Sequence, residues 1–181
     1  MVSLRSLITQ KLLNYFFLNQ DEERYVRELA KMFEVDPKNL GTKLKELEGE
    51  GLLKSETRGQ ERYYSLNKGF SLLNEYKGIV FKTVGVEFLL KDALKRIDGV
   101  AEVYIFGSYA KNKMDAGSDI DVLVVGDQSV LDVQRAIVKI MKNIGREINV
   151  VNMSVSELEK RKKAKDFFIE KIFSESIIKL V

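Results

Sequence analysis

FGSYAKNKMDAGSDIDVLVV, residues 106–125, is the most informative segment of the chain. An apolar run ends in Gly107 and Ser108, and after a short polar stretch Asp119 and Asp121 open a second apolar run. Residues i and i+2 of a strand point to the same face, so we expect the two carboxylates to lie side by side. Paired carboxylates at the start of a buried strand need a neutralising partner. A divalent cation is suitable, because Mg²⁺ is commonly held by one or two carboxylates together with substrate phosphates.

Gly107 and Ser108 supply the second half of the predicted site. Gly107 has no Cβ, which lets the backbone approach a ligand closely. If a helix begins at Ser108, its N–H groups and dipole face an anion. Either Lys111 or Lys113 could stabilise a leaving pyrophosphate, the alternative being that each lysine is simply solvated. The segment therefore predicts a site for a nucleoside triphosphate bound with Mg²⁺ or Mn²⁺.

The pattern Gly-Ser, linker, Asp-x-Asp, apolar strand resembles the signature of the DNA polymerase beta-type nucleotidyltransferases, especially their minimal members. The resemblance covers residues 106–125. It implies a small α/β nucleotidyltransferase domain with a mixed sheet over residues 85–181. It also implies roles for individual residues: Asp119 and Asp121 as catalytic and metal-binding residues, and Gly107, Ser108 and Lys111 at the nucleotide. The alternative, a surface hairpin with two solvated aspartates, explains neither the Gly-Ser turn nor the flanking apolar strands.

One position departs from the family pattern. Residues 146–151, REINVV, are predicted to form the next strand after a helix over residues 130–144. Many active members carry a third carboxylate at the position that aligns with Asn149. An asparagine can ligate a metal through its carbonyl but cannot act as a base, and Glu147 lies one i, i+2 step away on the same face. Nucleotide binding is therefore expected, whereas efficient catalysis is left open.

Composition narrows the chemistry further. The chain has 181 residues, no cysteine and no histidine, and a formal net charge of +3. Disulfides, thiol nucleophiles, histidine bases and the common zinc sites are therefore excluded. No apolar run is long enough to cross a membrane, and we expect a cytoplasmic protein. The net charge is too small to indicate nucleic-acid binding by itself.

The first third of the chain reads as a separate unit. Apolar residues at helical spacing predict helices over residues 4–18 and 26–33, and Asp36-Pro37 is a typical N-cap and first residue of a third helix. Asp21 to Arg24 reads as a charged break. Two β-prone runs, residues 52–57 and 61–66, flank Arg58-Gly59-Gln60 and predict a hairpin.

This order of elements resembles the winged helix-turn-helix domain of ArsR- and MarR-type transcription regulators over residues 1–67. The resemblance implies that the third helix enters the major groove of DNA and that the hairpin touches the backbone or the minor groove. The candidate DNA-binding residues are Lys38, Asn39, Thr42, Lys43 and Lys45 on the helix and Arg58, Gln60 and Arg62 on the hairpin. The alternative is a solvated surface used for protein contacts, since Glu46, Glu48 and Glu50 dilute the positive charge.

The rest of the chain completes the predicted layout. Residues 68–84 are expected to be a helical linker, with Gly85 separating it from a helix over residues 86–94. Ser154-x-x-Glu157 predicts an N-cap for a helix that includes EKRKKAK, residues 159–165, and residues 177–181 a final short strand. The basic run reads either as a solvated face or as a nucleic-acid contact. We thus expect an α+β protein with two domains.

Three functions are consistent with this layout. The first is a transcriptional regulator that binds double-stranded DNA, forms a homodimer and carries a domain that binds, and could transfer, a nucleotide. The second is an antitoxin-like nucleotidyltransferase that modifies a protein or RNA partner recruited by the winged helix. The third is a pseudoenzyme that senses nucleotides or dimerises.

Overall fold

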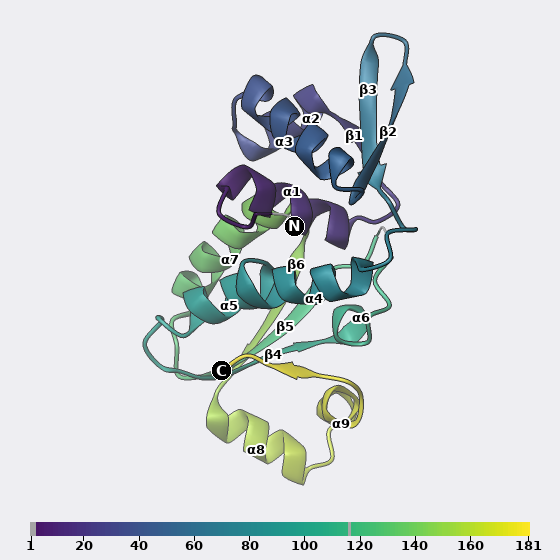
Figure 1. Cartoon of the computed structure of the whole chain (residues 1–181). Helices are drawn as coiled ribbons and strands as arrows, with labels where there is room; N and C mark the ends of the chain where they lie inside the picture. Colours follow the sequence, from purple (N-terminus) through teal and green to yellow (C-terminus); the bar gives the residue numbers. More distant parts are fainter. Residues whose placement is uncertain (1–2, 116) are drawn as a thin grey trace. The chain divides into compact units, whose positions relative to one another are not determined.

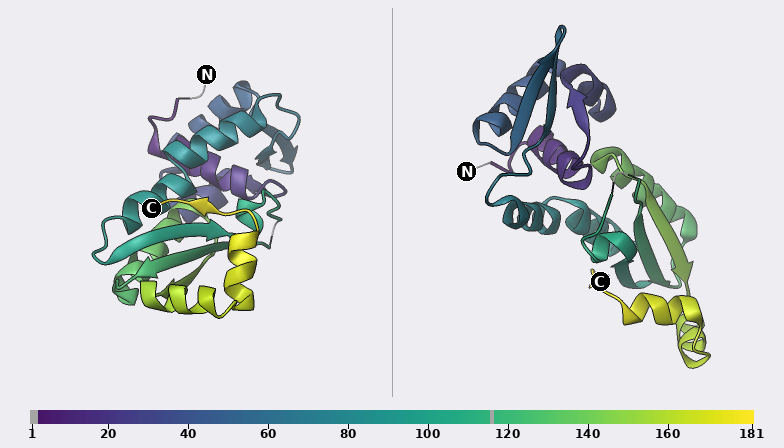
Figure 2. Two further views of the ribbon diagram at one scale, coloured as in Figure 1. Left: turned by 90° about the horizontal axis from the view of Figure 1, so that it is seen from below. Right: turned by 90° about the vertical axis from the view of Figure 1, so that its right-hand side faces the viewer.

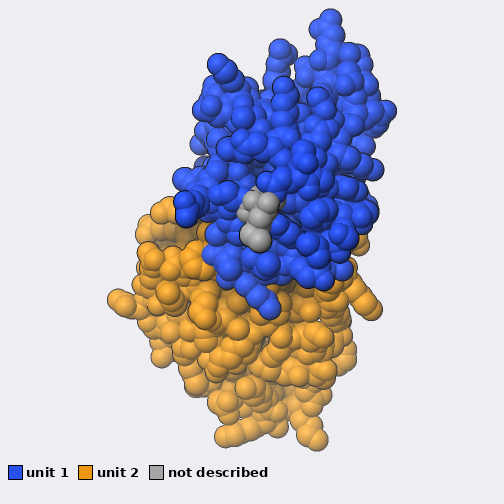
Figure 3. All heavy atoms as spheres, in the orientation of Figure 1, with its two compact units in different colours: residues 1–86, 142–145 blue, residues 87–141, 146–181 orange. Residues whose placement is uncertain are grey.

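The computed structural model describes residues 3–115 and 117–181, which fall into two compact units (Figure 3). Residues up to Val86, together with residues 142–145, form the first unit, and residues 87–141 and 146–181 form the second. Both helices and sheets occur in each, so the α+β class is confirmed. The predicted domain limits at residues 67 and 84 stay a prediction. No helix among the described residues is long and apolar enough to span a membrane.

The first unit combines helices with a small antiparallel sheet of strand order β1-β3-β2. In Figure 1 the hairpin of β2 and β3 projects away from the helices of this unit. The elements are α1 (Leu7–Leu18), β1 (Glu23–Tyr25), α2 (Val26–Phe33), α3 (Pro37–Gly49), β2 (Leu53–Arg58), β3 (Glu61–Leu66) and α4 (Leu73–Thr83).

Local sequence signals explain most of these boundaries. The Asp36 carboxylate accepts a hydrogen bond from the Asn39 N–H at 2.8 Å, and Pro37 is the first residue of α3. Ser6 caps α1 in the same way, so that helix begins three residues later than the apolar pattern indicated. Both caps satisfy N–H groups that have no partner within the helix.

Strand β1 corrects the sequence interpretation. Residues 21–24 were expected to form a charged break, yet Glu23–Tyr25 pairs antiparallel with β3, with Glu23 opposite Ser65 and Tyr25 opposite Tyr63. Two charged residues before a tyrosine carry no alternation that predicts a strand. The pairing exists because β3 offers a free edge, which is a tertiary property.

The second unit is built on a mixed sheet, as the family resemblance implied, and the strand order is β6-β5-β4-β7. Strand β5 is antiparallel to β4 and parallel to β6, and β7 pairs antiparallel with β4. The elements are α5 (Val86–Leu94), β4 (Val100–Phe106), α6 (Gly107–Ala110), β5 (Ile120–Gly126), α7 (Val130–Ile144), β6 (Ile148–Met153), α8 (Val155–Lys163), α9 (Phe167–Ser174) and β7 (Ile178–Lys179).

Helices α8 and α9 cover one face of this sheet (Figures 1 and 2). The buried cluster on that face joins the strands to both helices, and Phe106 packs against its edge. Its members are Tyr104, Leu123, Val125, Met153, Leu158, Ile169 and Ile172. Helix α9 was not predicted from the sequence. Because strand neighbours alternate between faces, every residue in register with this cluster shares the face that α8 and α9 cover.

Candidate active site

Asp119 and Asp121 meet at the start of β5, as their spacing predicted. Asp121 lies opposite Phe106 of β4 and opposite Asn149 of β6, and Asp119 lies two residues earlier on the same side of the chain. Both aspartates are half-buried. Phe106 packs against the cluster on the α8–α9 face, so the two carboxylates lie on that face as well.

Asn149 connects the strands at this point. Its Nδ2 donates a hydrogen bond to Asp119 Oδ2 at 3.0 Å. The side chain is exposed, and it occupies the position at which the family resemblance predicts a third carboxylate in active members. Glu147 is exposed too, and its backbone carbonyl accepts from the Ile120 N–H at 3.0 Å, one pleat before Asn149. The parallel register therefore groups one amide with two carboxylates and places Glu147 at the margin.

Burial opposes ionisation of the carboxylate pair. Partial burial raises the pKa of Asp121, the Asn149 amide lowers it by a smaller amount, and the Asp119 charge raises it again. The net shift is upward, because both desolvation and a like charge disfavour the ionised form. A bound cation would therefore lower the free-energy cost of ionising Asp121 in the folded protein.

Gly107 brings the backbone against this pair. Its φ is +72°, in the left-handed region, and a Cβ placed there would come within 2.4 Å of Asp121 Oδ2. The helix that begins at this glycine, α6, is a single turn of four residues, Gly107–Ala110, so the dipole contribution expected from the sequence is small. Close approach of the backbone, rather than a long helix, is what this turn provides.

A methyl group at position 107 should damage the site. We expect Gly107→Ala to weaken binding of a Mg²⁺–nucleoside triphosphate by about tenfold or more, because the Asp121 carboxylate must move away from the new Cβ. The matched control is Gly59→Ala. Gly59 has φ +63°, and no atom lies within 4 Å of a Cβ at that position. Both variants carry a backbone strain of roughly 1–2 kcal/mol. Calorimetric titration and thermal melting compare them, and equal losses of nucleotide affinity would contradict this account of Gly107.

Lys111 and Tyr109, which follow Gly107, have partners within the second unit. Lys111 Nζ pairs with Glu175 Oε2 at 2.6 Å, so this predicted nucleotide-binding residue is tied to the segment after α9. The buried Tyr109 hydroxyl donates to Glu87 Oε1 at 3.2 Å. Burial and the Glu87 charge raise the pKa of Tyr109, which keeps the phenol neutral.

The donor set fits a hard divalent cation. Asp119 and Asp121 offer carboxylate oxygens on one face, and Asn149 offers an amide oxygen if its side chain rotates. Among the described residues, no group of three or more histidine, cysteine, aspartate or glutamate side chains is gathered as a metal site. A cation held here would draw its remaining oxygen ligands from phosphates and water, which is how Mg²⁺ is commonly bound.

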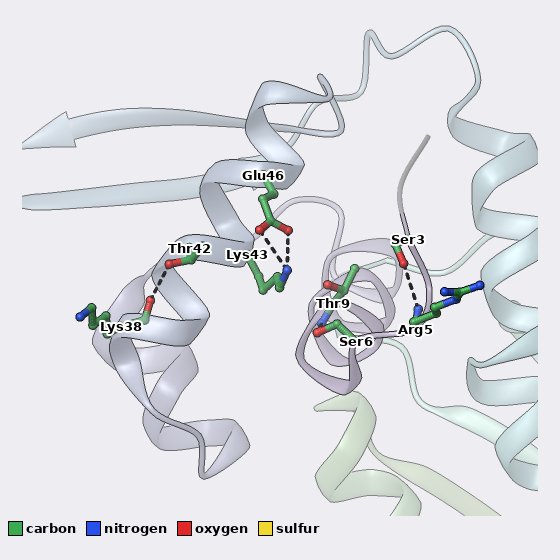
Figure 4. Close-up of polar contacts among 8 residues, drawn as sticks. All are labelled: Ser3, Arg5, Ser6, Thr9, Lys38, Thr42, Lys43 and Glu46. Atoms are coloured by element: carbon green, nitrogen blue, oxygen red, sulfur yellow. Dashed lines mark hydrogen bonds and ion pairs between the residues drawn. The ribbon is translucent and has the colours of Figure 1, made fainter.

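In the first unit, the predicted DNA-binding residues on α3 fall into two groups. Lys38, Asn39 and Thr42 are exposed, and the Thr42 hydroxyl donates to the Lys38 carbonyl at 3.1 Å. Lys43 instead forms an ion pair with Glu46 at 2.7 Å (Figure 4). Its side chain lines a cavity of about 320 Å³ together with other residues of α3 and with Ser3, Arg5, Ser6 and Thr9 at and before the start of α1. The structure therefore separates Lys43 from the exposed group.

Both arginines of the hairpin are also paired with glutamates. Arg58 contacts Glu23 and Glu56 at 2.6 Å each. Arg62 contacts both carboxylate oxygens of Glu48 at 2.8 Å. Gln60 lies exposed at the hairpin tip. Residues 1–67 carry 11 lysines and arginines and 11 aspartates and glutamates, so their formal net charge is zero. A phosphate backbone would therefore have to displace existing carboxylate partners, which lowers the electrostatic gain of DNA binding.

Phe106 was not among the residues singled out from the sequence. It lies beside Asp121 in the sheet, and its ring contacts that of Phe168 from α9 at 6.1 Å between centroids. An aromatic residue at the end of an apolar run reads as core. Only the strand register and the unpredicted helix α9 place it next to the carboxylates.

Comparison with known proteins identifies the second unit. A sequence profile of the family described as "Nucleotidyltransferase domain" matches residues 89–179, half of the chain. No curated protein matches. A structure described as a toxin–antitoxin with AMP-PNP shows 18% sequence identity and a TM-score of 0.35, over 49% of this chain and 84% of that one. A protein from Sulfolobus solfataricus, provisionally named a nucleotidyltransferase, shows 23% identity and a TM-score of 0.29, over 41% and 68%. Both TM-scores are below 0.5, so neither likeness shows what this chain does.

Proposed function

We propose, from the premise that the chain belongs to the nucleotidyltransferase domain family, that its second unit transfers a nucleotidyl group from a nucleoside triphosphate to a partner macromolecule. The partner is a protein or an RNA, and the first unit recruits it. The observation that carries this proposal is the pair Asp119 and Asp121 on one sheet face, with the Gly107 backbone against it.

The transfer assigns a role to each part of the site. A hydroxyl oxygen of the partner forms a bond to the α-phosphorus, the bond from that phosphorus to the β-phosphate oxygen breaks, and pyrophosphate leaves. Asp119 and Asp121 hold a Mg²⁺ or Mn²⁺ ion, which supplies positive charge to the phosphates when bound. Gly107 and Ser108 bring the backbone close to the triphosphate, and Lys111 is the candidate cation for the leaving group once it releases Glu175.

Asn149 limits the rate of this reaction. The partner hydroxyl loses its proton during transfer, and an amide cannot accept it. In this chain the proton passes to water or to Glu147 at the edge of the site. We therefore expect slow transfer with intact nucleotide binding, a property suited to occasional modification of a partner rather than to rapid turnover.

We assign the first unit a winged helix-turn-helix architecture used for recruitment. The order of helices followed by the β2–β3 hairpin supports it. Recruitment of a macromolecule other than duplex DNA is favoured, because Lys43, Arg58 and Arg62 are each engaged by a glutamate. The exposed residues Lys38 and Asn39 at the start of α3 form the proposed contact surface.

The recruiting surface can be tested by charge reversal. We expect Lys38→Glu combined with Asn39→Ala to reduce labelling of the partner in cell extract by about tenfold or more, the effect of losing about 1.4 kcal/mol of contact energy. Lys54→Glu is the control, because Lys54 is an exposed lysine of β2 in the same unit. Labelling that survives in the α3 variant would remove this surface from the proposal.

A gel shift with genomic fragments, performed on the same proteins, addresses the competing reading. A fragment retained more tightly than random DNA, with retention lost in the α3 variant, would establish the DNA-binding regulator instead.

The function as a whole is tested with α-labelled nucleoside triphosphates, Mg²⁺ and cell extract. A labelled protein or RNA band that requires both Asp119 and Asp121 is the expected result. Nucleotide binding without any labelled product, over hours and across all four nucleotides, would leave a nucleotide sensor in place of an enzyme.

A further inference from the structure

A cluster of unpaired cations lies where α8 ends. Lys160, Lys163 and Lys165 are exposed, and within the part of the chain that the structure describes no carboxylate forms an ion pair with them. The neighbouring cations differ: Arg161 pairs with Glu157 at 2.6 Å, and Lys162 lies 4.7 Å from the centre of the Phe173 ring. Three positive charges therefore remain directed at solvent within six residues of sequence.

An exposed aromatic residue follows these lysines directly. Phe167, the first residue of α9, is 80% exposed, the highest value among the large apolar side chains of the described residues. It lines an open groove of about 590 Å³ together with Glu170, Lys171, Phe173 and Ser174, so one carboxylate and one further lysine also face this groove. Lysines at a helix C-terminus are explained by the helix dipole alone. That explanation gives no reason to hold a phenylalanine in water beside them.

This surface borders the candidate active site. The next residue, Phe168, contacts Phe106 at 6.1 Å between ring centroids, and Phe106 lies opposite Asp121 in the sheet. The first turn of α9 is thus joined to the carboxylate face by one aromatic contact. We call the surface formed by Lys160, Lys163, Lys165 and Phe167 the α8–α9 edge.

We propose that the α8–α9 edge binds a single-stranded nucleic acid and presents its terminal hydroxyl to the active site. The proposal rests on the proposed nucleotidyl transfer and names the acceptor class for it. A single strand offers unstacked bases to an aromatic ring and phosphates to separate cations, which is the combination that this edge displays. A duplex keeps its bases stacked, and an acidic peptide gives an exposed phenylalanine no stacking partner.

The acceptor reaction follows the same balance as above. The terminal hydroxyl oxygen of the strand forms the bond to the α-phosphorus of the nucleoside triphosphate, the bond from that phosphorus to the β-phosphate oxygen breaks, pyrophosphate leaves, and the hydroxyl proton passes to water or to Glu147. The strand grows by one nucleotide. The lysines hold the phosphates of the nucleotides preceding the terminus, and Phe167 holds one of their bases.

Binding is measured without metal, so that it is independent of transfer. Fluorescence anisotropy in EDTA with an unstructured RNA of about 12 nucleotides, and with DNA of the same sequence, gives the affinity of the full chain. We expect Phe167→Ala to weaken binding by about 5- to 150-fold, the range for one lost base–aromatic stack. The double variant Lys163→Ala, Lys165→Ala should lower the slope of log affinity against log salt by about 1.4, or about 0.7 for each lost phosphate contact.

The matched controls lie on other helices of the same unit. Phe88→Ala removes a 42% exposed phenylalanine of α5, and Lys91→Ala with Lys139→Ala removes two exposed lysines. The proposal is overturned if the controls weaken binding as much as the α8–α9 variants, if Phe167→Ala leaves affinity unchanged, or if duplex DNA or a poly-glutamate peptide competes as well as the single strand. The ratio of RNA to DNA affinity identifies the sugar of the acceptor.

The same proteins separate this proposal from the nucleotidyl transfer on which it rests. Titration with a nucleoside triphosphate and Mg²⁺ reports on the site formed by Asp119, Asp121 and the Gly107 turn, and it involves none of the residues of the α8–α9 edge. If the wild type binds no nucleotide but its binding of the single strand depends on Phe167, the proposed transfer is refuted and the proposed binding surface stands. If the wild type binds nucleotide but its binding of the single strand does not depend on Phe167, the binding surface is refuted and the transfer stands.

Discussion

Replacing Asp119 or Asp121 with asparagine is expected to abolish most Mg²⁺-dependent nucleotide binding, with a loss of affinity of about tenfold or more for each. Each change removes a charged ligand from the pair at the start of β5, and metal-site ligands and their supports commonly contribute at that scale. Calorimetry with ATP and Mg²⁺ measures the loss, and the label-transfer assay should lose its product in both variants.

The thermal stability of the Asp121→Asn variant should not fall with its nucleotide affinity. Burial and the Asp119 charge raise the pKa of Asp121, so its ionised form is disfavoured in the folded protein. A neutral amide of the same shape relieves that cost. Without metal, Asp121→Asn should therefore melt at the same temperature as wild type or higher, and the gain should fade as acid protonates Asp121 in the wild type.

Asp127→Asn provides the control for both measurements. Asp127 is an exposed carboxylate that follows Gly126, at the opposite end of the same strand. It should leave nucleotide affinity and labelling unchanged. If both the Asp119 and the Asp121 variant bind nucleotide with wild-type affinity, the metal-site assignment is wrong. If either variant unfolds, the replaced aspartate is needed for folding, which its half-buried position at the start of a strand does not predict.

Changing Asn149 to aspartate is expected to accelerate transfer, by up to roughly 10²–10⁴ if the missing base alone limits the rate. The substitution is close to isosteric. It adds a carboxylate opposite Asp121 in the parallel register, and it removes the 3.0 Å hydrogen bond that Asn149 donates to Asp119. Mg²⁺ affinity should rise, because a third negative oxygen ligand joins the pair.

The metal-free protein should lose stability in the same variant. Three carboxylates then repel one another without the amide donor, and we expect a melting temperature lower by about 2–4 °C for each kcal/mol lost. Mg²⁺ should restore it. Thermal melts with and without Mg²⁺, together with single-turnover labelling, measure the two effects.

Asn152→Asp is the matched change on the same strand. Asn152 lies opposite Val124 and three residues from Asn149, so it faces the other side of the sheet. It should change neither transfer nor Mg²⁺ affinity. A wild type that transfers rapidly and is slowed by Asn149→Asp would show that Glu147, one pleat earlier, performs the role assigned to position 149.

Local chemistry made the carboxylate pair predictable. Asp119 and Asp121 share a face because strand geometry repeats every two residues, whatever the surrounding fold. The role of Gly107 was predictable for a similar reason, since a glycine at the end of an apolar run indicates a position where the backbone leaves no room for a Cβ. The caps at Asp36 and Ser154 depend on hydrogen bonds to N–H groups three residues away, and the structure contains both.

Other features had no local signal. Strand β1 forms only because the edge of β3 is free to pair with it. Helix α9 was not predicted, because its short sequence is equally consistent with the end of the preceding basic helix. The predicted DNA contacts at Arg58 and Arg62 looked available in sequence, yet Glu23 and Glu48 reach them from 35 and 14 residues away. Pairings at such separations depend on how the elements pack.

The sequence by itself therefore determined which groups the candidate site contains: two carboxylates, a glycine that lets the backbone approach them and the Asn149 amide, in a chain with neither cysteine nor histidine. Tertiary structure alone decided the surroundings of that chemistry. Register put Phe106 and Asn149 beside Asp121, and folding brought Phe168 of α9 against Phe106 on the same face. The physical reason is the separation in sequence between the interacting residues. Periodicity and capping act over two to four residues, so they can be recognised in the sequence. Strand pairing and ion pairing join distant residues that only the packed core brings together.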